Sequence, residues 1–414
     1  MADILVIGGG AAGMMAALFA ARAGAEVLLL EHNEKLGKKI YITGKGRCNL
    51  TNLCDREEFL AQVPRNPRFL YSALDFFSPR EMMALLEQAG CPVTVQRGRR
   101  VFPASEKASD VTKALSALLR QAGVTVRLGT EVRALAVEEG ALRGVRLADD
   151  TVIPARAVIL ATGGCSYPST GSTGDGFRIA AEAGHTVLPP LPSLSALETE
   201  EAWPARLQGL SLRNVTLALL RGEKVLYREL GELLFTHFGV SGPLVLEASC
   251  HLPEAAGGLR LSLDLKPGLT AEQLDARLRR EFAAAGKKQL RNLLPALLPL
   301  RLAECLPALC GFPEGLTCSQ VTGPQRAALV ARLKDLPLTV RDRRPLAEAI
   351  ITRGGVSVKE IRPGTMESRK LPGLYLAGEV IDVDAHTGGY NLQIAWSTGA
   401  LAGRSAAENL KGND

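Results

Sequence analysis

Residues 4–31 read ILVIGGGAAGMMAALFAARAGAEVLLLE, and this stretch decides the fold. An apolar run before the glycines predicts a buried strand, and the alanine-rich run after them predicts a helix followed by a second strand. Gly8, Gly10 and Gly13 have G-x-G-x-x-G spacing. This spacing allows a tight turn, close approach of a pyrophosphate and close packing of the helix on the strand. The pattern therefore predicts a Rossmann-type site for a dinucleotide.

The acidic residue at the end of this unit indicates which dinucleotide binds. Glu31 follows the second strand, where a carboxylate accepts hydrogen bonds from a ribose 2′-hydroxyl and repels a 2′-phosphate. Backbone N–H groups at the helix start, near Ala11 and Ala12, would face the pyrophosphate. A glycine turn alone is common in proteins, but here strand, glycines, helix, strand and acid occur in order. We therefore expect FAD or NAD rather than NADP.

The composition is that of an ordinary globular protein. The chain has 414 residues, of which 46% are hydrophobic and 22% charged, enough for two or three domains. The uncharged run at 4–21 resembles a signal peptide or a membrane span at first sight. However, it follows Asp3 instead of a basic region, and it contains four glycines. We expect no membrane partner.

The eight cysteines lack the spacing of a disulfide framework or a metal site. Cys305, Cys310 and Cys318 cluster loosely but without a histidine pattern, so we expect no bound metal. Cys48 and Cys54 could form a redox pair, although two ordinary thiols are the simpler interpretation. Such cysteine usage suits a reducing compartment, and we predict a cytoplasmic protein.

The formal net charge of +6 and the arginine clusters at 97–100 and 341–344 could indicate an anionic partner such as RNA. Short clusters more often form a solvated face. No RNA-binding motif is visible, and only 5% of the residues are aromatic. We therefore expect a small-molecule substrate and no nucleic-acid partner. The sequence does not specify an oligomeric state.

Two further stretches combine small and polar residues in a way that favours ligand contact. Residues 43–52 read TGKGRCNLTN, in which glycines permit close approach of a flat ligand, Arg47 offers a donor fork and Asn49 a polar amide. Residues 157–164 read AVILATGG, a buried strand that runs directly into a small-residue turn. Open α/β sheets bind ligands at the carboxyl ends of such strands, so this turn predicts a second wall of the same site.

The segment 373–399 adds a third wall. A short strand ends at Gly378-Glu379, and a loop containing Gly388-Gly389 precedes a helix that we expect from about Ile394 to Leu410. The start of this helix would direct backbone donors and its positive dipole end at the ligand. Such an end stabilises the negative charge of a reduced flavin near N1 and the C2 carbonyl.

Changes of periodicity indicate the domain organisation. Prolines at 189–192 interrupt the first pattern, strand-like alternation follows, and helical periods follow that. We predict an α/β fold in which residues 1–190 and 346–414 form one discontinuous Rossmann-type domain. A β insert would span residues 191–268 plus about 334–345, and a helical insert residues 269–333.

Three stretches together resemble a flavoprotein family. TGKGRCNLTN at 43–52 and AGEVIDVDAHTGGYNLQ at 377–393 look like motifs of the BaiN-like family, also called aminoacetone oxidase-like FAD-binding proteins. The match includes the glycine unit at 8–31 and covers nearly the whole chain. Members are bacterial FAD proteins whose Rossmann-type domain is interrupted by a β-barrel-like insert and a helical insert. The resemblance therefore implies FAD and this architecture.

The resemblance also implies which residues bind the cofactor. Gly8, Gly10, Gly13 and Glu31 would hold the ADP half, with Val132 near the adenine. The full predicted set is Gly8, Gly10, Ala11, Ala12, Gly13, Glu31, His32, Lys39, Gly44, Gly46, Arg47, Cys48, Asn49, Val132, Thr162, Gly163, Gly164, Gly378, Glu379, Asp382, Gly388, Gly389, Tyr390, Asn391, Leu392 and Gln393. Lys45 and Ala385-His386 depart from the family pattern; if they lie over the flavin ring, the substrate preference would differ from that of relatives.

The best-defined activity of the family is the reduction of conjugated carbon–carbon double bonds in 3-oxo bile-acid intermediates. The resemblance implies an FAD-dependent oxidoreductase that exchanges hydride between flavin N5 and a small apolar substrate such as an enone. An amine oxidase acting on an aminoacetone-like substrate and a flavin-dependent RNA-modifying protein are the alternatives. His237, His386 and Tyr167 are the candidate proton donors. Because no second G-x-G-x-x-G unit follows a strand, NADH or NADPH as reductant would dock transiently at the flavin.

Overall fold

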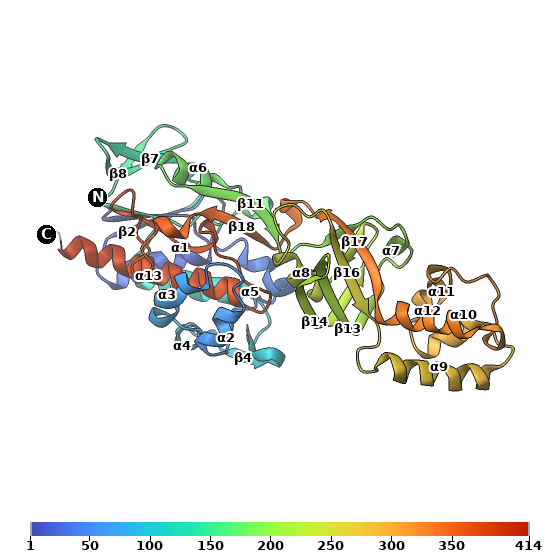
Figure 1. Cartoon of the computed structure of the whole chain (residues 1–414). Coiled ribbons are helices and arrows are strands. Elements are labelled where there is room, and N and C mark those ends of the chain that lie inside the picture. The colour runs from blue at the N-terminus through green and yellow to red at the C-terminus, as the bar shows by residue number, and fades with distance from the viewer. Residues whose placement is uncertain (1, 413–414) are drawn as a thin grey trace. The chain divides into compact units, whose positions relative to one another are not determined.

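The computed structural model describes residues 2–412, which form two compact units (Figure 1). Unit 1 combines the residues up to Ser193 with those from Pro345 onward, and unit 2 comprises Leu194–Arg344. Each unit has its own core of buried hydrophobic side chains. Unit 1 contains both ends of the described chain.

A five-stranded sheet forms the centre of unit 1, and its neighbouring strands pair in parallel. Strands of parallel sheets are buried on both faces, which explains the apolar sequences of four of these strands; the fifth, at one edge of the sheet, reads Thr-Val-Arg. The order across the sheet is β19 (Leu374–Leu376), β10 (Ala157–Leu160), β1 (Ile4–Ile7), β2 (Val27–Leu30) and β6 (Thr125–Arg127). The carboxyl ends of all five strands therefore lie along one edge.

The first and last helices pack against each other through small residues. These are α1 (Ala11–Arg22) and α13 (Tyr390–Gly412), which lie side by side in Figure 1. A Cβ atom added to Gly399 would lie 2.2 Å from the carbonyl oxygen of Ala12. One added to Gly403 would lie 2.0 Å from that of Ala16. Glycine thus permits the close approach of the two backbones, and the expected discontinuous Rossmann-type domain is confirmed.

The remaining elements of unit 1 are helices and small sheets. The helices are α2 (Arg56–Ala61), α3 (Tyr71–Phe76), α4 (Pro79–Gln88), α5 (Ala108–Gln121) and α6 (Asp175–Glu182). The sheets pair β3 (Thr51–Asn52) with β5 (Arg100–Pro103) and β4 (Val93–Gln96), β7 (Val132–Glu138) with β8 (Ala141–Leu147) and β9 (Val152–Pro154), and β11 (Val187–Ser193) with β18 (Ile351–Val356).

The prolines expected to interrupt the first domain lie inside strand β11. Pro189 and Pro190 fall where the register of the β11–β18 pair shifts, between Leu188 and Leu191. A proline lacks the N–H that a strand partner would require, and a bulge removes that requirement. This proline run is therefore part of a strand pair.

Unit 2 contains a closed six-stranded barrel in which all pairings are antiparallel. The order around it is β12 (Leu197–Thr199), β15 (Gly239–Ser241), β14 (Lys224–Phe235), β13 (Ser211–Arg221), β16 (Leu259–Asp264) and β17 (Leu336–Arg343). In β16, buried and half-buried side chains alternate, as expected for a strand with one face inside a barrel. The expected β-barrel-like insert is confirmed.

Helices follow β16 and precede β17. They are α9 (Ala271–Ala285), α10 (Leu290–Leu293), α11 (Leu300–Leu309) and α12 (Gly323–Lys334); the short α7 (Trp203–Arg206) and α8 (Pro243–Cys250) lie earlier in unit 2. Leu274, Leu278 and Phe282 lie four residues apart on α9, and all three are buried. A capping box formed by Thr270 and Gln273 begins this helix.

Within residues 2–412, no helix is both long enough and apolar enough to span a membrane. The same residues contain no group of three or more histidine, cysteine, aspartate or glutamate side chains arranged to hold a metal ion.

Candidate cofactor and active site

The predicted cofactor motifs follow three adjacent strands of the parallel sheet. Ile7 of β1, Leu160 of β10 and Leu376 of β19 are register partners at the carboxyl edge. The residues after them are correspondingly close, because a Cβ on Gly8 would lie 2.6 Å from the carbonyl oxygen of Ala161. The sheet thus brings the three glycine-containing turns together, although they are separated by more than 150 residues in the sequence.

The first turn leaves an open space at the start of α1. Gly8 has a φ of +100°, and a Cβ on Gly13 would lie 1.7 Å from the carbonyl oxygen of Gly8, so neither position accepts a side chain. By contrast, a Cβ on Gly10 would meet no described atom within 4 Å. Helix α1 has no side-chain cap and no acid in its first turn. Its backbone donors and positive dipole end are therefore suited to an anionic ligand.

Glu31 lies at the tip of β2, beside the same turn. Its buried carboxylate accepts hydrogen bonds from the backbone N–H of Gly9 at 2.6 Å and of Asn33 at 2.8 Å. The Asn33 side chain donates a third hydrogen bond at 2.7 Å. A carboxylate accepts about four hydrogen bonds, so a ribose hydroxyl could donate the remaining one.

Two further residues of the predicted cofactor set, His32 and Val132, lie in the same unit. The exposed His32 follows Glu31, and a Cβ on Gly171 would lie 2.5 Å from its Nε2 atom. Val132 begins β7 and is buried.

The loop at 43–49 has an unusual backbone. Gly44, Lys45 and Cys48 all have left-handed φ angles, of +57°, +59° and +61°. Each non-glycine residue in this region costs about 1 kcal/mol or more, so surrounding contacts must impose the conformation. One such contact is the hydrogen bond from the Cys48 N–H to the Thr43 carbonyl at 3.0 Å. Burial raises the pKa of the Cys48 thiol to about 12, which keeps it neutral.

The Arg47 side chain makes contacts within the protein that the sequence does not predict. Its guanidinium carbon lies 4.4 Å from the centre of the Phe102 ring, and Nη1 lies 3.0 Å from a Glu106 carboxylate oxygen. This cation–π and ion-pair arrangement orients the side chain. If Arg47 donates hydrogen bonds to a ligand, its guanidinium would do so from this position.

Helix α13 begins at Tyr390, four residues earlier than expected. Asn391 explains the difference: its side chain accepts the N–H of Ala385 at 2.9 Å and donates to the carbonyl of Ala385 at 2.7 Å. These bonds fold the preceding loop back onto the first turn. Gly389 lies against strand β3, where a Cβ would be 2.5 Å from the carbonyl carbon of Thr51. The amino-terminal end of α13 is therefore formed by Gly388 and Gly389.

Two aspartates in this loop are buried in different settings. Asp384 lies 3.1 Å from Nε of Arg65 and accepts a 2.6 Å hydrogen bond from the Ser193 hydroxyl. Asp382 accepts a hydrogen bond from the Asn66 side chain at 3.1 Å. Burial raises the pKa of Asp382, and the charge of Arg65 opposes that shift. Asp384 thus has an ion-pair partner, whereas burial favours the protonated form of Asp382.

Lys39 and Glu379 form a hydrogen-bonded network with two residues that were absent from the predicted set. Lys39 Nζ lies 2.8 Å from Glu379 and 2.6 Å from the hydroxyl of Ser166. The Thr352 N–H donates to the other Glu379 oxygen at 2.7 Å. A Cβ on Gly164 would lie 2.4 Å from Thr352 Oγ1, which fixes the turn after β10 against β18. No local sequence pattern marks Thr352.

Several buried polar atoms near these motifs have no partner among the described residues. They are Asn49 Oδ1, Thr51 Oγ1, Thr162 Oγ1 and Gln393 Oε1. An unpaired buried polar group costs about 1–3 kcal/mol, so such atoms commonly mark a missing ligand or water. Together with the open space at Gly10 and the uncapped α1, they fit a large polar cofactor such as FAD.

The three candidate proton donors have different settings. His386 donates its backbone N–H to the Gln62 carbonyl at 2.9 Å, and its Nδ1 lies 3.2 Å from Gln62 Oε1. Burial lowers the pKa of His386, while Asp384 opposes the shift. Tyr167 is half-buried, with a left-handed φ of +51°, in the loop after β10. His237 is exposed in unit 2, where its ring packs edge to face on Phe238 at 5.0 Å.

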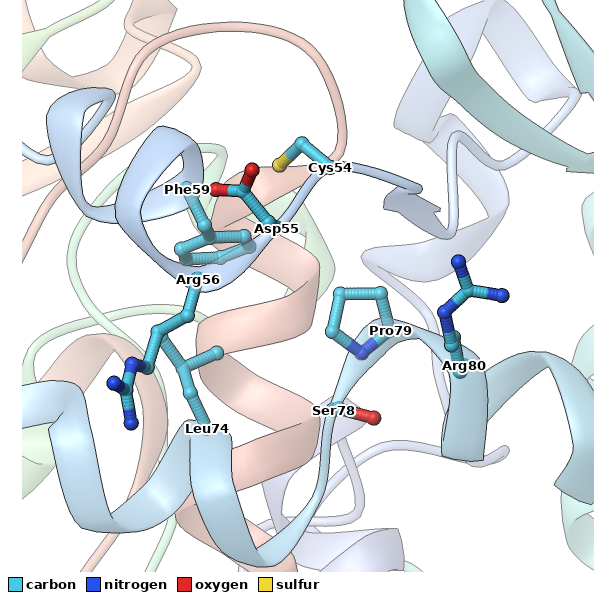
Figure 2. A pocket seen from close by; sticks show the side chains of 8 residues that line it. All are labelled: Cys54, Asp55, Arg56, Phe59, Leu74, Ser78, Pro79 and Arg80. Atoms are coloured by element: carbon cyan, nitrogen blue, oxygen red, sulfur yellow. The ribbon is translucent and has the colours of Figure 1, made fainter.

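A separate pocket of about 190 Å³ lies among α2, α3 and α4 (Figure 2). The Phe59 ring that lines it packs edge to face on Tyr390, with ring centres 5.1 Å apart. Burial raises the pKa of the neighbouring Cys54 thiol to about 11. The lining residues are Cys54, Asp55, Arg56, Phe59, Leu74, Ser78, Pro79 and Arg80. None of them belongs to the predicted cofactor set.

Comparison with known proteins agrees with this geometry. The family model described as "HI0933-like protein Rossmann domain" matches residues 2–405. The chain belongs to this family. It is an enzyme of an FAD-dependent oxidoreductase family, and its Rossmann domain implies FAD as cofactor. This confirms the family resemblance recognised in the sequence motifs.

Two relatives match over nearly their whole length. A 3-dehydro-bile acid delta(4,6)-reductase of Clostridium scindens is 35% identical over 413 residues, covering 99% of this chain and 100% of the relative. A ribosomal RNA dihydrouridine synthase of Escherichia coli is 34% identical over 397 residues, covering 96% of each chain.

Solved structures show a similar fold. A quinol-fumarate reductase has a TM-score of 0.54 and 18% identity, covering 100% of this chain and 72% of that chain. A 3-ketosteroid delta1-dehydrogenase of Sterolibacterium denitrificans has a TM-score of 0.51 and 15% identity, covering 99% of each chain. At these identities the similarity concerns the fold alone.

Proposed function

We propose that this protein uses FAD to reduce a carbon–carbon double bond conjugated to a carbonyl group. The observation that carries the proposal is the convergence of three glycine turns at one sheet edge, with unpaired buried polar atoms beside them. The activities named for two relatives support the choice of reaction. A delta(4,6)-reductase of a 3-dehydro bile acid and a synthase of dihydrouridine both saturate a double bond conjugated to a carbonyl.

The proposed cofactor site has an ADP half and a flavin half. Gly8–Gly13 and the start of α1 would bind the pyrophosphate, and Glu31 the adenosine ribose, with His32 and Val132 on the adenine side. The loops at 43–49 and 162–164 would contact the flavin half. The remaining members of the proposed set are Lys39, Gly378, Glu379, Asp382, Gly388, Gly389, Tyr390, Asn391, Leu392 and Gln393.

When bound, FAD would supply the hydride that saturates the double bond. The chain must stabilise negative charge and deliver a proton. At the start of α13, beside Gly388 and Gly389, backbone N–H groups and the positive end of the helix dipole would stabilise an anionic ring system. We propose His386 as the proton donor, because it lies in the loop that Asn391 holds against this helix end. The acid would be the imidazolium form, whose lowered pKa makes it a stronger proton donor, and the proton would leave from Nε2, because Nδ1 faces Gln62 Oε1.

Two substrate classes share the proposed chemistry: steroid-like enones and uridine in RNA. The expectation of a small apolar substrate follows the first relative, whereas the second relative makes a nucleic-acid substrate a direct competitor. The difference in identity between them, 35% against 34%, does not favour either class. NADH or NADPH would be the reductant in both cases.

The test is a stepwise anaerobic experiment on purified protein. Bound flavin should show its visible absorption, and NADH or NADPH should bleach it. The bleached protein should then be reoxidised by a 3-oxo-Δ4 steroid or by uridine-containing RNA, whereas aminoacetone should not bleach the oxidised flavin. Product mass should rise by two hydrogens. Bleaching of the oxidised flavin by aminoacetone without any nicotinamide would identify an amine oxidase instead, and protein that never binds FAD would refute the proposal.

The role of His386 needs its own readout. His386→Gln should lower the rate of reoxidation by substrate at least about 10-fold, which is the low end expected for loss of a general acid, while the rate of flavin bleaching changes little. His237→Gln, in unit 2, is the matched histidine control and should affect neither step. Equal rates in the two variants would remove His386 from the mechanism.

A further inference from the structure

The positive charge of this protein is concentrated in the helices of unit 2. Residues 270–334 contain ten lysines and arginines but five aspartates and glutamates, so they carry most of the chain's formal charge of +6. Within them, residues 276–303 contain seven basic residues and one acid, Glu281. The Glu281 carboxylate already has a partner, because its Oε1 atom accepts a 2.7 Å hydrogen bond from Arg277. Helix α9 itself is balanced, because it also carries Glu272 and Asp275, so the local excess of positive charge lies in the residues after it, at Lys287, Lys288 and Arg291.

Four basic side chains in this region form what we call the basic surface: Arg280, Lys287, Lys288 and Arg291. All four are exposed. Arg280, Lys287 and Lys288 have no ion-pair partner among the described residues, and Arg291 reaches the highly exposed Glu314 only at 4.0 Å. Some other cations of unit 2 are paired at short range, for example Arg260 with Asp335 at 2.9 Å. The basic surface is thus available to an external anion.

The end of α9 does not require these charges. Lysines near a helix C-terminus commonly stabilise its free carbonyl groups. Here backbone donors already occupy the carbonyls of Phe282, Ala285 and Gly286, at 3.0–3.1 Å. The carbonyl of Lys288 likewise accepts the Cys318 N–H at 2.9 Å. Helix capping therefore explains the backbone of this turn but not the side chains of Lys287 and Lys288.

We propose that the basic surface docks the phosphate backbone of single-stranded RNA. The inference rests on the proposed function, because it takes uridine in RNA as the substrate class. Arg280 lies in the last two turns of α9, and Lys287 and Lys288 follow the end of this helix by two and three residues, so the cations are neighbours along the chain. No exposed aromatic residue accompanies the four cations between residues 276 and 303, so the contact reads the backbone and not the bases. A single strand is expected since a uridine must leave the base stack before a buried group can reduce it.

The test measures binding of a fluorescein-labelled, uridine-containing 20-nucleotide RNA to the FAD-loaded full chain. Anisotropy titrations between 50 and 200 mM KCl should show an affinity that falls steeply with salt, with a log–log slope of about −0.7 for each neutralised phosphate. Lys287→Glu/Lys288→Glu should lower the affinity at 100 mM KCl at least about 10-fold and make the slope shallower. Both side chains are exposed, so the fold should tolerate the change.

The matched control is Lys224→Glu/Arg228→Glu on the barrel. Both of these residues are exposed on β14, and the control changes the net charge by the same amount. It should leave RNA affinity within about twofold, because its side chains lie outside the basic surface. Equal losses in the two double variants would show that only total charge matters and would overturn the proposal. Competition by polyglutamate as effective as that by unlabelled RNA would overturn it as well, since the surface would then fit an acidic protein.

Flavin chemistry is measured on the same samples to separate the two claims. Both double variants should retain bound FAD and bleach with the nicotinamide at the rate of the unmodified protein. If the unmodified protein reduces a steroid enone but fails to bind RNA, the docking surface is refuted and the proposed function stands. If it binds RNA through the basic surface but never reduces a conjugated double bond, the proposed function is refuted and the docking surface stands.

Discussion

The backbone N–H of Gly9 donates a 2.6 Å hydrogen bond to Oε2 of Glu31, which joins the turn after β1 to the tip of β2. The carboxylate therefore has two tasks: it holds the glycine turn in place, and it offers a remaining lone pair to a ribose. This coupling predicts that a change at Glu31 alters both the shape of the pyrophosphate site and the ribose contact.

Glu31→Gln should weaken FAD binding about 10- to 100-fold, because hydrogen bonds to a charged group are worth about 1.5–3 kcal/mol. The affinity is measured by titrating deflavinated protein with FAD. Glu34→Gln removes the same charge from an exposed side chain three residues later and should bind FAD normally. Equal affinities in the two variants would show that Glu31 does not contact the cofactor.

Gly399→Ala should destabilise the protein by about 1–3 kcal/mol, as expected for overpacking at a close contact. The added Cβ would lie 2.2 Å from the carbonyl oxygen of Ala12 and would push α13 away from α1. Gly412→Ala adds the same methyl group to the same helix, where no described atom lies within 4 Å. That control should be neutral or slightly stabilising. Urea unfolding measures both, and similar losses would contradict the packing argument.

The part of this fold that could be predicted from sequence is the part fixed by local patterns. The strand–glycine–helix unit at 4–31 can be predicted because buried strands, tight turns and helices each have a short-range sequence pattern. Strand β11 does not, since the pairing that accommodates Pro189 and Pro190 comes from β18, more than 150 residues later. Periodicity predicts the start of α13 four residues too late, because it does not reveal the side-chain hydrogen bonds between Asn391 and Ala385.

The site residues divide in the same way. The positions of the glycines and of Glu31 in the site could be predicted from their spacing. Each of these residues has a backbone conformation or a hydrogen bond that the motif requires. Ser166 and Thr352 could not, since their partner Glu379 is 213 and 27 residues away in the sequence and neither lies in a motif. The orientation of Arg47 toward Phe102 and Glu106 is likewise a tertiary result.

The free energy of unfolding should decrease as the pH falls below about 7, and His185 should contribute to this decrease. Ser368 accepts the N–H groups of Lys370 and Leu371 at 3.0 and 2.9 Å, so its own proton points to His185 Nε2 at 2.8 Å. The other ring nitrogen, Nδ1, then donates to Glu360 at 3.2 Å. Burial lowers the pKa of His185 from its usual 6.5, and the Glu360 carboxylate opposes the shift.

A lowered histidine pKa means that the unfolded chain binds the proton more readily. The contribution of His185 is therefore fully present above pH 6.5 and is lost as the pH falls through its folded-state pKa. Chemical unfolding at pH 7, 6 and 5 should show this decline, to which His386 adds in the same direction. His185→Gln should be less stable at pH 7 but should show a shallower decline. A decline as steep as that of the unmodified protein would exclude His185 as a source.

Cys48 and Cys54 should not react with iodoacetamide in the native protein at pH 7.5. The thiolate is the nucleophile, and burial raises the pKa of these thiols to about 12 and about 11. After brief alkylation, peptide mass spectrometry should find both unmodified, whereas protein unfolded in urea should be alkylated at both. Rapid native alkylation of either thiol would revive the redox-pair interpretation.

Lys39 and Glu379 are 340 residues apart in the sequence, yet Nζ and Oε2 lie 2.8 Å apart with side chains that are 22% and 16% exposed. Lys39→Met would leave the carboxylate facing Ser166 and Thr352 alone, and we expect a loss of about 1–3 kcal/mol, less than for a fully buried pair because water still reaches both groups. Lys38→Met should cost less than about 1 kcal/mol, since its partner Glu34 is exposed.

The pairing itself is measured by a double-mutant cycle with Glu379→Gln. Lys39→Met/Glu379→Gln should be more stable than the sum of the single losses predicts, because neither variant group is then left as an unpaired charge. Strict additivity in urea unfolding would mean that the two side chains do not stabilise each other.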